Sequence, residues 1–127
     1  MVSNENIIQG GDNKMKLVIE KESSNLIIKL KGQLDLHTAQ DFKNKVKKQL
    51  SNKINNIVLD LEAIDFIDSS GIGAILSLYK KIENKGGEVV IINMSPTLNR
   101  IFELSGVLKI IESYSSRRQA LENLSRR

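Results

Sequence analysis

The sequence predicts a single α/β domain built on a mixed, mainly parallel sheet. Segments with strand-like patterns alternate with segments whose apolar residues recur at helical spacing, which is typical of βαβ crossovers. Two strand-like segments open the series without a helix between them, so part of the sheet is expected to be antiparallel. The chain has 127 residues, which suits one domain with a buried core.

The beginning of the chain divides into a leader and the first strand pair. Residues 1–14 are polar, lack a periodic pattern and contain two adjacent glycines, which predicts a flexible leader and a domain over residues 15–127. Lys16–Glu20 is a short strand candidate. Asn25–Lys31 alternates more clearly and is expected to end at Gly32.

The first predicted helix begins near Thr38. Thr38 followed by Asp41 is similar to a capping box, with Asp in the place of Glu. Lysines occupy one side of this helix. The other side has apolar residues at helical spacing: Ala39, Phe42, Val46 and Leu50. A second clear strand, Asn55–Leu61, comes next.

The polar run Asp65–Gly71 is predicted to be a turn into a second helix. One apolar stripe marks that helix: Ile72, Ile75, Leu76, Tyr79 and Ile82. Gly86 and Gly87 end it. Glu88–Met94 has a continuous apolar middle, which indicates a strand covered on both faces.

The last third of the chain predicts two more helices. Ser95 suits an N-cap and Pro96 the first helical position, where no N–H is needed, and Gly106 ends this helix. Leu108–Ile111 is predicted to add an edge strand. Ser116 and Gln119 form a second capping-box pattern, which starts a helix through Leu124.

Composition excludes several classes of protein. The chain has no cysteine, so disulfides and thiol chemistry are excluded. It has one histidine. No apolar run approaches the roughly 18–20 residues of a membrane span, and no secretory signal pattern is present, so we expect no membrane insertion and a cytoplasmic location. The net charge of +4 suits an acidic partner or nucleic acid, but lysines on solvated helix faces explain it too. We expect no direct nucleic-acid binding.

Two polar segments lie where predicted strands pass into helices, the usual location of ligand and partner sites in open α/β sheets. They are Gly32–Thr38 and Asp65–Gly73. Ser69 and Ser70 stand at a helix start, where free N–H groups favour an anion and a hydroxyl can accept a phosphoryl group. Glycines at 71 and 73 would let another molecule approach the backbone. The alternative is an ordinary N-cap followed by a glycine turn.

Enzymatic readings lack the necessary residues. A nucleophilic serine needs a base, and His37 is the only histidine. Phosphate-loop, dinucleotide and nucleophile-elbow motifs are absent. Asp35, Asp65 and Asp68 are able to gather around Mg²⁺, or to serve as capping and turn residues. We expect no enzyme activity, cofactor or metal.

Several motifs together resemble the STAS domain, in particular the bacterial anti-sigma factor antagonists. They are GQLDLHTAQDFK, DFIDSSGIGAIL, GGEVVIINMSPTLNRIFELSGVLKII and SSRRQALENL, in the family's order and spacing. The resemblance runs from about Met15 to Leu124. It implies a mixed sheet of four or five strands, with about four helices packed mainly on one face.

The resemblance also implies a mechanism. The unphosphorylated protein would bind an anti-sigma factor that is a GHKL-type serine kinase, and would thereby release the sigma factor. The kinase would then phosphorylate the serine after the motif aspartate, and a PP2C-type phosphatase would reset the switch. Transferred to this chain, the phosphorylated residue is Ser69. The partner-binding residues are Asp35, His37, Thr38, Asp68, Ser70 and Gly71.

One alternative keeps the fold but changes the function. The chain would be a STAS scaffold, or a transporter-associated subunit, that is not switched at Ser69. This chain departs from the family pattern at Arg117 and Arg118, which stand at a helix start that the family usually makes more acidic.

Overall fold

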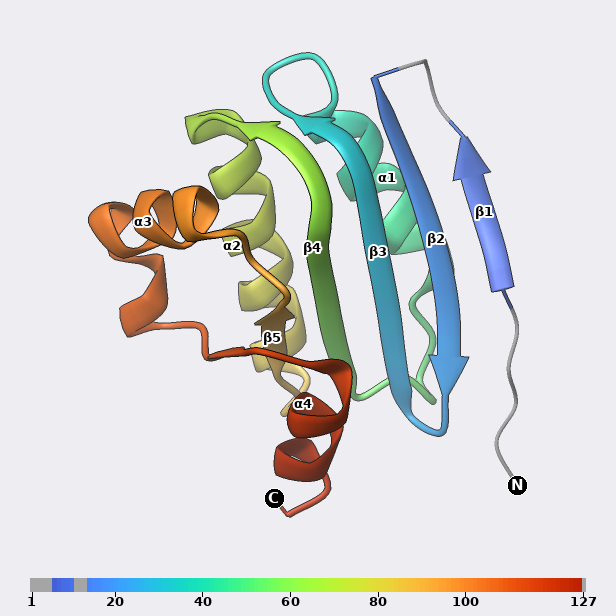
Figure 1. Ribbon diagram of the computed structural model, residues 1–127. Coiled ribbons are helices and arrows are strands. Elements are labelled where there is room, and N and C mark those ends of the chain that lie inside the picture. Colours follow the sequence, from blue (N-terminus) through green and yellow to red (C-terminus); the bar gives the residue numbers. More distant parts are fainter. Residues whose placement is uncertain (1–5, 11–13, 127) are drawn as a thin grey trace.

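The structure is a computed structural model that describes the backbone of residues 6–10 and all of residues 14–126 (Figure 1). Its elements follow the predicted alternation of strands and helices. In chain order they are β1 (Asn6–Gly10), β2 (Met15–Glu22), β3 (Asn25–Leu34), α1 (Ala39–Gln49), β4 (Asn56–Ile67), α2 (Ser69–Asn84), β5 (Val89–Ile92), α3 (Pro96–Ser105), the 3₁₀ turn η1 (Val107–Lys109), β6 (Ser113–Tyr114) and α4 (Arg117–Leu124).

The sheet confirms the predicted single α/β domain. In the described part of the chain the strands lie in sequence order, β1 to β6, with antiparallel pairing from β1 to β3 and parallel pairing from β3 to β6. The sheet has one strand more than the largest expected number, because Asn6–Gly10 pairs with β2. The fold class is therefore mixed and mainly parallel, as predicted.

Strand β1 differs from the prediction of a flexible leader. An unpaired β2 would expose a row of backbone N–H and C=O groups, and the β-branched residues of Asn6–Gly10 favour an extended partner. Of the other leader residues, 1–5 and 11–13 lie outside the described residues. The domain boundary at residue 15 therefore stays a prediction.

Helices α1, α2 and α3 cover one face of the sheet and α4 covers part of the other (Figure 1). The larger core lies under the first three helices and includes Phe42, Ile75 and Phe102, each 0% exposed. Within α2, Ile75 and Ile82 are fully buried, whereas Leu76 and Tyr79 of the predicted stripe are only partly buried. Leu76 therefore contributes less to the core than the sequence pattern predicts.

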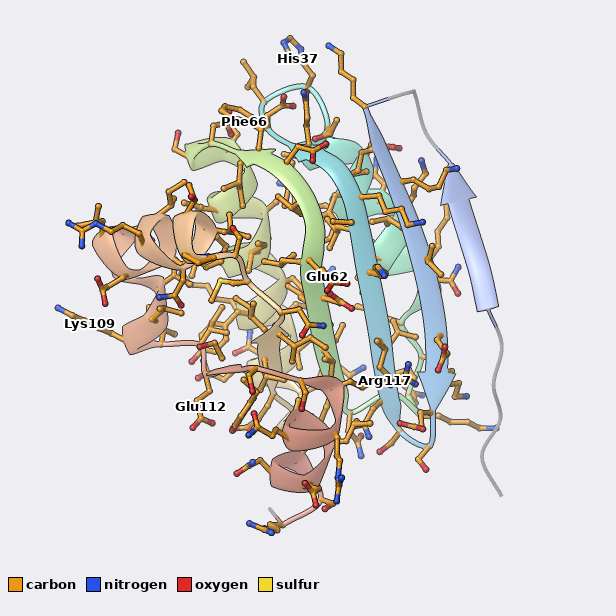
Figure 2. All side chains as sticks on the ribbon, in the orientation of Figure 1. His37, Glu62, Phe66, Lys109, Glu112 and Arg117 are labelled. Atoms are coloured by element: carbon orange, nitrogen blue, oxygen red, sulfur yellow. The ribbon has the colours of Figure 1, made fainter. Side chains whose placement is uncertain are left out.

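Helix α4 packs on the opposite face, over β4 and β5. Ala120 and Leu124 meet Val58 and Val90 in a second, smaller core. Ser116 caps the helix, as predicted, by accepting a hydrogen bond from the Gln119 N–H. Arg117 donates to Glu20 of β2, so this helix is also tied to a strand nearly a hundred residues earlier in the chain (Figure 2).

Three predicted boundaries are wrong for physical reasons. Gly32 does not end β3 but forms a bulge at φ +96°, close against the Lys14 carbonyl. Because β3 continues to Leu34, it pairs with β4 as far as Ile67, so Asp65–Ile67 is strand and not turn. The predicted edge strand Leu108–Ile111 is replaced by η1, and the edge pairing is made by β6 instead.

Candidate functional site

Two strand-to-helix connections lie side by side at the carboxyl edge of the sheet. Strands β3 and β4 are parallel neighbours and end together, with Gln33 opposite Phe66 and Leu34 opposite Ile67. The first connection leads from β3 into α1 and the second from β4 into α2 (Figure 1). The structure thus brings together the two polar segments that the sequence singled out.

Asp68 joins these two connections. Its Oδ1 accepts hydrogen bonds from the backbone N–H groups of Ser70 (2.9 Å) and Gly71 (3.1 Å), which makes it the N-cap of α2. Its Oδ2 accepts from the Leu36 N–H at 3.1 Å, across to the other connection. Both carboxylate oxygens are therefore engaged, and the side chain fixes one loop against the other.

Asp35 and Thr38 form a compact network inside the first connection. Asp35 Oδ1 accepts from the N–H groups of His37 (2.9 Å) and Thr38 (3.2 Å), and the Thr38 hydroxyl donates to the Gln33 carbonyl. Both side chains are buried, with 8% of Asp35 and 1% of Thr38 exposed. The predicted capping box is wrong: Thr38 makes no side-chain cap, and Asp41 pairs with Lys45 instead.

The three residues after Asp68 differ in exposure. Ser69 is exposed, Ser70 is half-buried and Gly71 is buried. A Cβ atom on Gly71 would lie 2.1 Å from the Leu34 carbonyl oxygen. The backbone of β3 therefore leaves no room for a side chain at position 71. A Cβ atom on Gly73 would meet nothing within 4 Å, so this second glycine leaves room for another molecule.

Two large apolar side chains are exposed near the ends of β3 and β4, and the sequence pattern did not predict them. Leu36 is 71% exposed and Phe66 is 51% exposed. Figure 2 places His37 and Phe66 at the same end of the molecule, where β3 and β4 end. The available signal was local: each apolar residue stands beside an aspartate in a segment without core periodicity.

The arrangement suits binding better than catalysis. Asp35 and Asp68 hold backbone N–H groups, and no group of three or more histidine, aspartate or glutamate side chains among residues 6–10 and 14–126 is placed to hold a metal ion. No helix in that same part of the chain has both the length and the apolar character needed to cross a membrane. What the site offers is the exposed Ser69 residue, with exposed apolar surface from Leu36 and Phe66 at the same end of the sheet.

Known proteins are similar to this chain in sequence and in fold. The STAS domain model matches residues 16–120. An anti-sigma F factor antagonist from Paenibacillus polymyxa is 37% identical over 113 residues, covering 87% of this chain and 97% of its own. An anti-sigma factor antagonist from Mycobacterium paratuberculosis shares the fold at a TM-score of 0.79 and 20% identity, over 92% of this chain and 99% of its own.

The Bacillus antagonist SpoIIAA has been solved in two chemical forms. Its unphosphorylated form has a TM-score of 0.69 at 21% identity, over 97% of this chain and 98% of its own. Its phosphorylated form has a TM-score of 0.61 at 22% identity, over 94% and 98%. The matched domain model, together with the relative at 37% identity, shows that the chain belongs to the STAS domain family, among its anti-sigma factor antagonists, which are non-enzymatic regulators.

Proposed function

We propose that this antagonist is a partner switch controlled by phosphorylation of Ser69. In the unphosphorylated form it binds a GHKL-type anti-sigma factor kinase in the cytoplasm and thereby releases the sigma factor. The kinase then phosphorylates Ser69 and the complex dissociates. A PP2C-type phosphatase restores the binding form.

The observation that carries the proposal is the setting of the Ser69 hydroxyl. Ser69 is exposed at the first position of α2, and within the described residues its hydroxyl has no hydrogen-bond partner. Leu36 and Phe66 supply exposed apolar surface at the same end of the sheet. A kinase can reach this hydroxyl without unfolding any element, and a partner covering it would bury apolar surface at the same time.

A phosphate on Ser69 would find little compensation inside this protein. It would add about −1.5 to −2 charges beside Asp68. The Ser70 and Gly71 N–H groups, which would otherwise stabilise an anion at the helix start, already donate to Asp68. The phosphate therefore remains hydrated in the free protein. Its desolvation costs free energy only when a partner covers it.

The remaining predicted partner-binding residues divide into two groups. His37 and Ser70 are able to contact a partner directly, because His37 is exposed and Ser70 half-buried. Asp35, Thr38, Asp68 and Gly71 act mainly by holding the two connections in place. This revises the expectation that Asp35 belongs to the contact surface.

Phosphosite mapping and calorimetry test the proposal. The protein is mixed with the organism's candidate anti-sigma kinases and ATP, and the modified residue is identified by mass spectrometry. We expect phosphate on Ser69, none on Ser69→Ala, and normal modification of Ser70→Ala. Ser69→Asp should weaken kinase binding by about 100-fold, which corresponds to about 3 kcal/mol. Equal affinities of Ser69→Asp and the parent protein, with phosphate on another residue, would contradict the switch.

The alternative is a STAS scaffold or transporter-associated subunit that is not switched at Ser69. A pulldown distinguishes the two functions. Recovery of a GHKL-type kinase supports the switch, whereas recovery of membrane or scaffold proteins alone supports the alternative.

A further inference from the structure

The positive charge of the chain is concentrated on the α1–α2 layer. Residues 39–55 and 69–85 contain eight lysines and two acidic residues, a net charge of +6, whereas the whole chain carries +4. The rest of the molecule is therefore slightly acidic. This asymmetry defines a basic face on the helical side of the sheet.

A groove between α1 and α2 lies within this basic face. It encloses about 210 Å³. Leu50, half-buried at the end of α1, provides its accessible apolar lining, whereas the bordering Phe42 and Leu78 are buried at 0% and 7% exposure. Lys43, Lys47 and Lys81 line the same groove, so apolar and cationic groups face one space.

These three lysines have no ion-pair partner among residues 6–10 and 14–126. Their neighbour Lys45, in contrast, lies 2.7 Å from the Asp41 carboxylate. The lysines are exposed, and their aliphatic stems extend the apolar lining while the ammonium groups remain available. The groove therefore lacks a carboxylate, and a ligand would have to bring it.

A protein segment fits this chemistry better than nucleic acid or a lipid surface. Neither helix contains arginine, and the one aromatic residue of α2, Tyr79, hydrogen-bonds Glu83, so a stacking surface for bases is missing. The exposed large apolar residues of the described chain are Leu36, Phe66, Leu104 and Ile110, none of them on α1 or α2. A membrane surface would need such residues on this face.

We propose that the α1–α2 groove binds an acidic segment of a protein partner. The segment places an aliphatic side chain against Leu50 and the aliphatic stems of the lysines, and it pairs its carboxylates with Lys43, Lys47 and Lys81. The inference does not rest on phosphorylation of Ser69, because the groove and its charges are independent of that hydroxyl.

A peptide titration followed by NMR tests the proposal. The probe is a synthetic amphipathic helix with leucines on one face and glutamates on the others. We expect chemical-shift changes along the facing sides of α1 and α2. A matched peptide with serines in place of the leucines should bind about tenfold more weakly, since it cannot fill the groove.

Charge variants identify the residues responsible. The triple variant Lys43→Glu, Lys47→Glu, Lys81→Glu should weaken the leucine peptide about tenfold. The control Lys16→Glu, Lys31→Glu, Lys109→Glu makes the same change in net charge on other exposed, unpaired lysines of the described chain and should leave affinity within about twofold. If the first variant does not fold, the chemical-shift changes in the parent protein and its affinity for the serine peptide still test the proposal. Equal weakening by both variants, shifts outside the groove, or tighter binding of duplex DNA or anionic vesicles through the same lysines would overturn the proposal.

Discussion

The two strand-to-helix connections use the same local chemistry for different purposes. In each, an aspartate Oδ1 accepts hydrogen bonds from the backbone N–H groups two and three residues later. Asp35 is buried, and its carboxylate accepts hydrogen bonds from His37 and Thr38 of the same connection. Asp68 is half-buried, and its second oxygen reaches Leu36 in the other connection. The first aspartate therefore stabilises a turn, whereas the second fixes the relative position of two turns.

The largest expected effect on stability comes from Gly71, whose backbone packs directly against the Leu34 carbonyl. Gly71→Ala would drive a methyl group into the Leu34 carbonyl, 2.1 Å away, and backbone cannot move aside cheaply. We expect a loss of about 3 kcal/mol in the free energy of unfolding, measured by urea denaturation. Gly73→Ala is the matched control: its added methyl meets nothing within 4 Å, and it should stabilise α2 by about 0.5–1 kcal/mol. Similar stabilities for the two variants would mean that the connections do not pack as described.

The buried Asp35 should matter more for folding than the half-buried Asp68. Asp35→Ala leaves the His37 and Thr38 N–H groups without their acceptor, the latter at a buried residue, so we expect a loss of about 1–3 kcal/mol. The family resemblance implies a partner-binding role for Asp35, and these hydrogen bonds add a role in stability. Asp35→Asn keeps the Oδ1 acceptor and should lose less. A thermal midpoint of Asp35→Ala equal to that of the parent protein would return Asp35 to the contact surface.

These differences explain which parts of the molecule were predictable from sequence. The Ser95 and Ser116 caps and the left-handed Gly106 at the end of α3 were predicted correctly because each depends on residues within one turn. Pairing of the two strand ends was also predictable, since parallel strands end at one edge. The Asp68–Leu36 bond was not, because it joins residues 32 positions apart and depends on the register of β3 and β4.

Other features escaped prediction for the same reason. The position of α4 depends on Arg117 reaching the glutamates of β2, and the formation of β1 depends on a free edge of that strand. Asp35 is buried by tertiary packing, although the polar sequence around it is typical of an exposed turn. Phosphorylation at Ser69 rests on the family resemblance and stays a prediction.

A subtler substitution isolates the contact between the connections. Asp68→Asn keeps an oxygen for the Ser70 and Gly71 N–H groups but turns an NH₂ group toward Leu36, where two donors then face each other. We expect a loss of only about 0.5–1 kcal/mol in unfolding free energy. Hydrogen exchange of the Leu36 amide should nevertheless become clearly faster, while that of Gly71 stays unchanged. Unchanged exchange at Leu36 would show that the bond does not hold the loops together.

The smallest effect on stability, and the clearest effect on function, should come from the exposed apolar residue of the first connection. Leu36→Ser changes a side chain that is 71% exposed, so unfolding free energy should stay within about 0.5 kcal/mol of the parent value. If the partner covers Ser69 and its surroundings, the same substitution removes apolar surface from the interface. We expect about a tenfold loss of affinity for the anti-sigma kinase in calorimetry. Leu104→Ser on α3 is an equally exposed control, also at 71%, and should bind like the parent protein. Equal affinities for both serine variants would remove Leu36 from the interface, and a loss confined to Leu104→Ser would move the interface to α3.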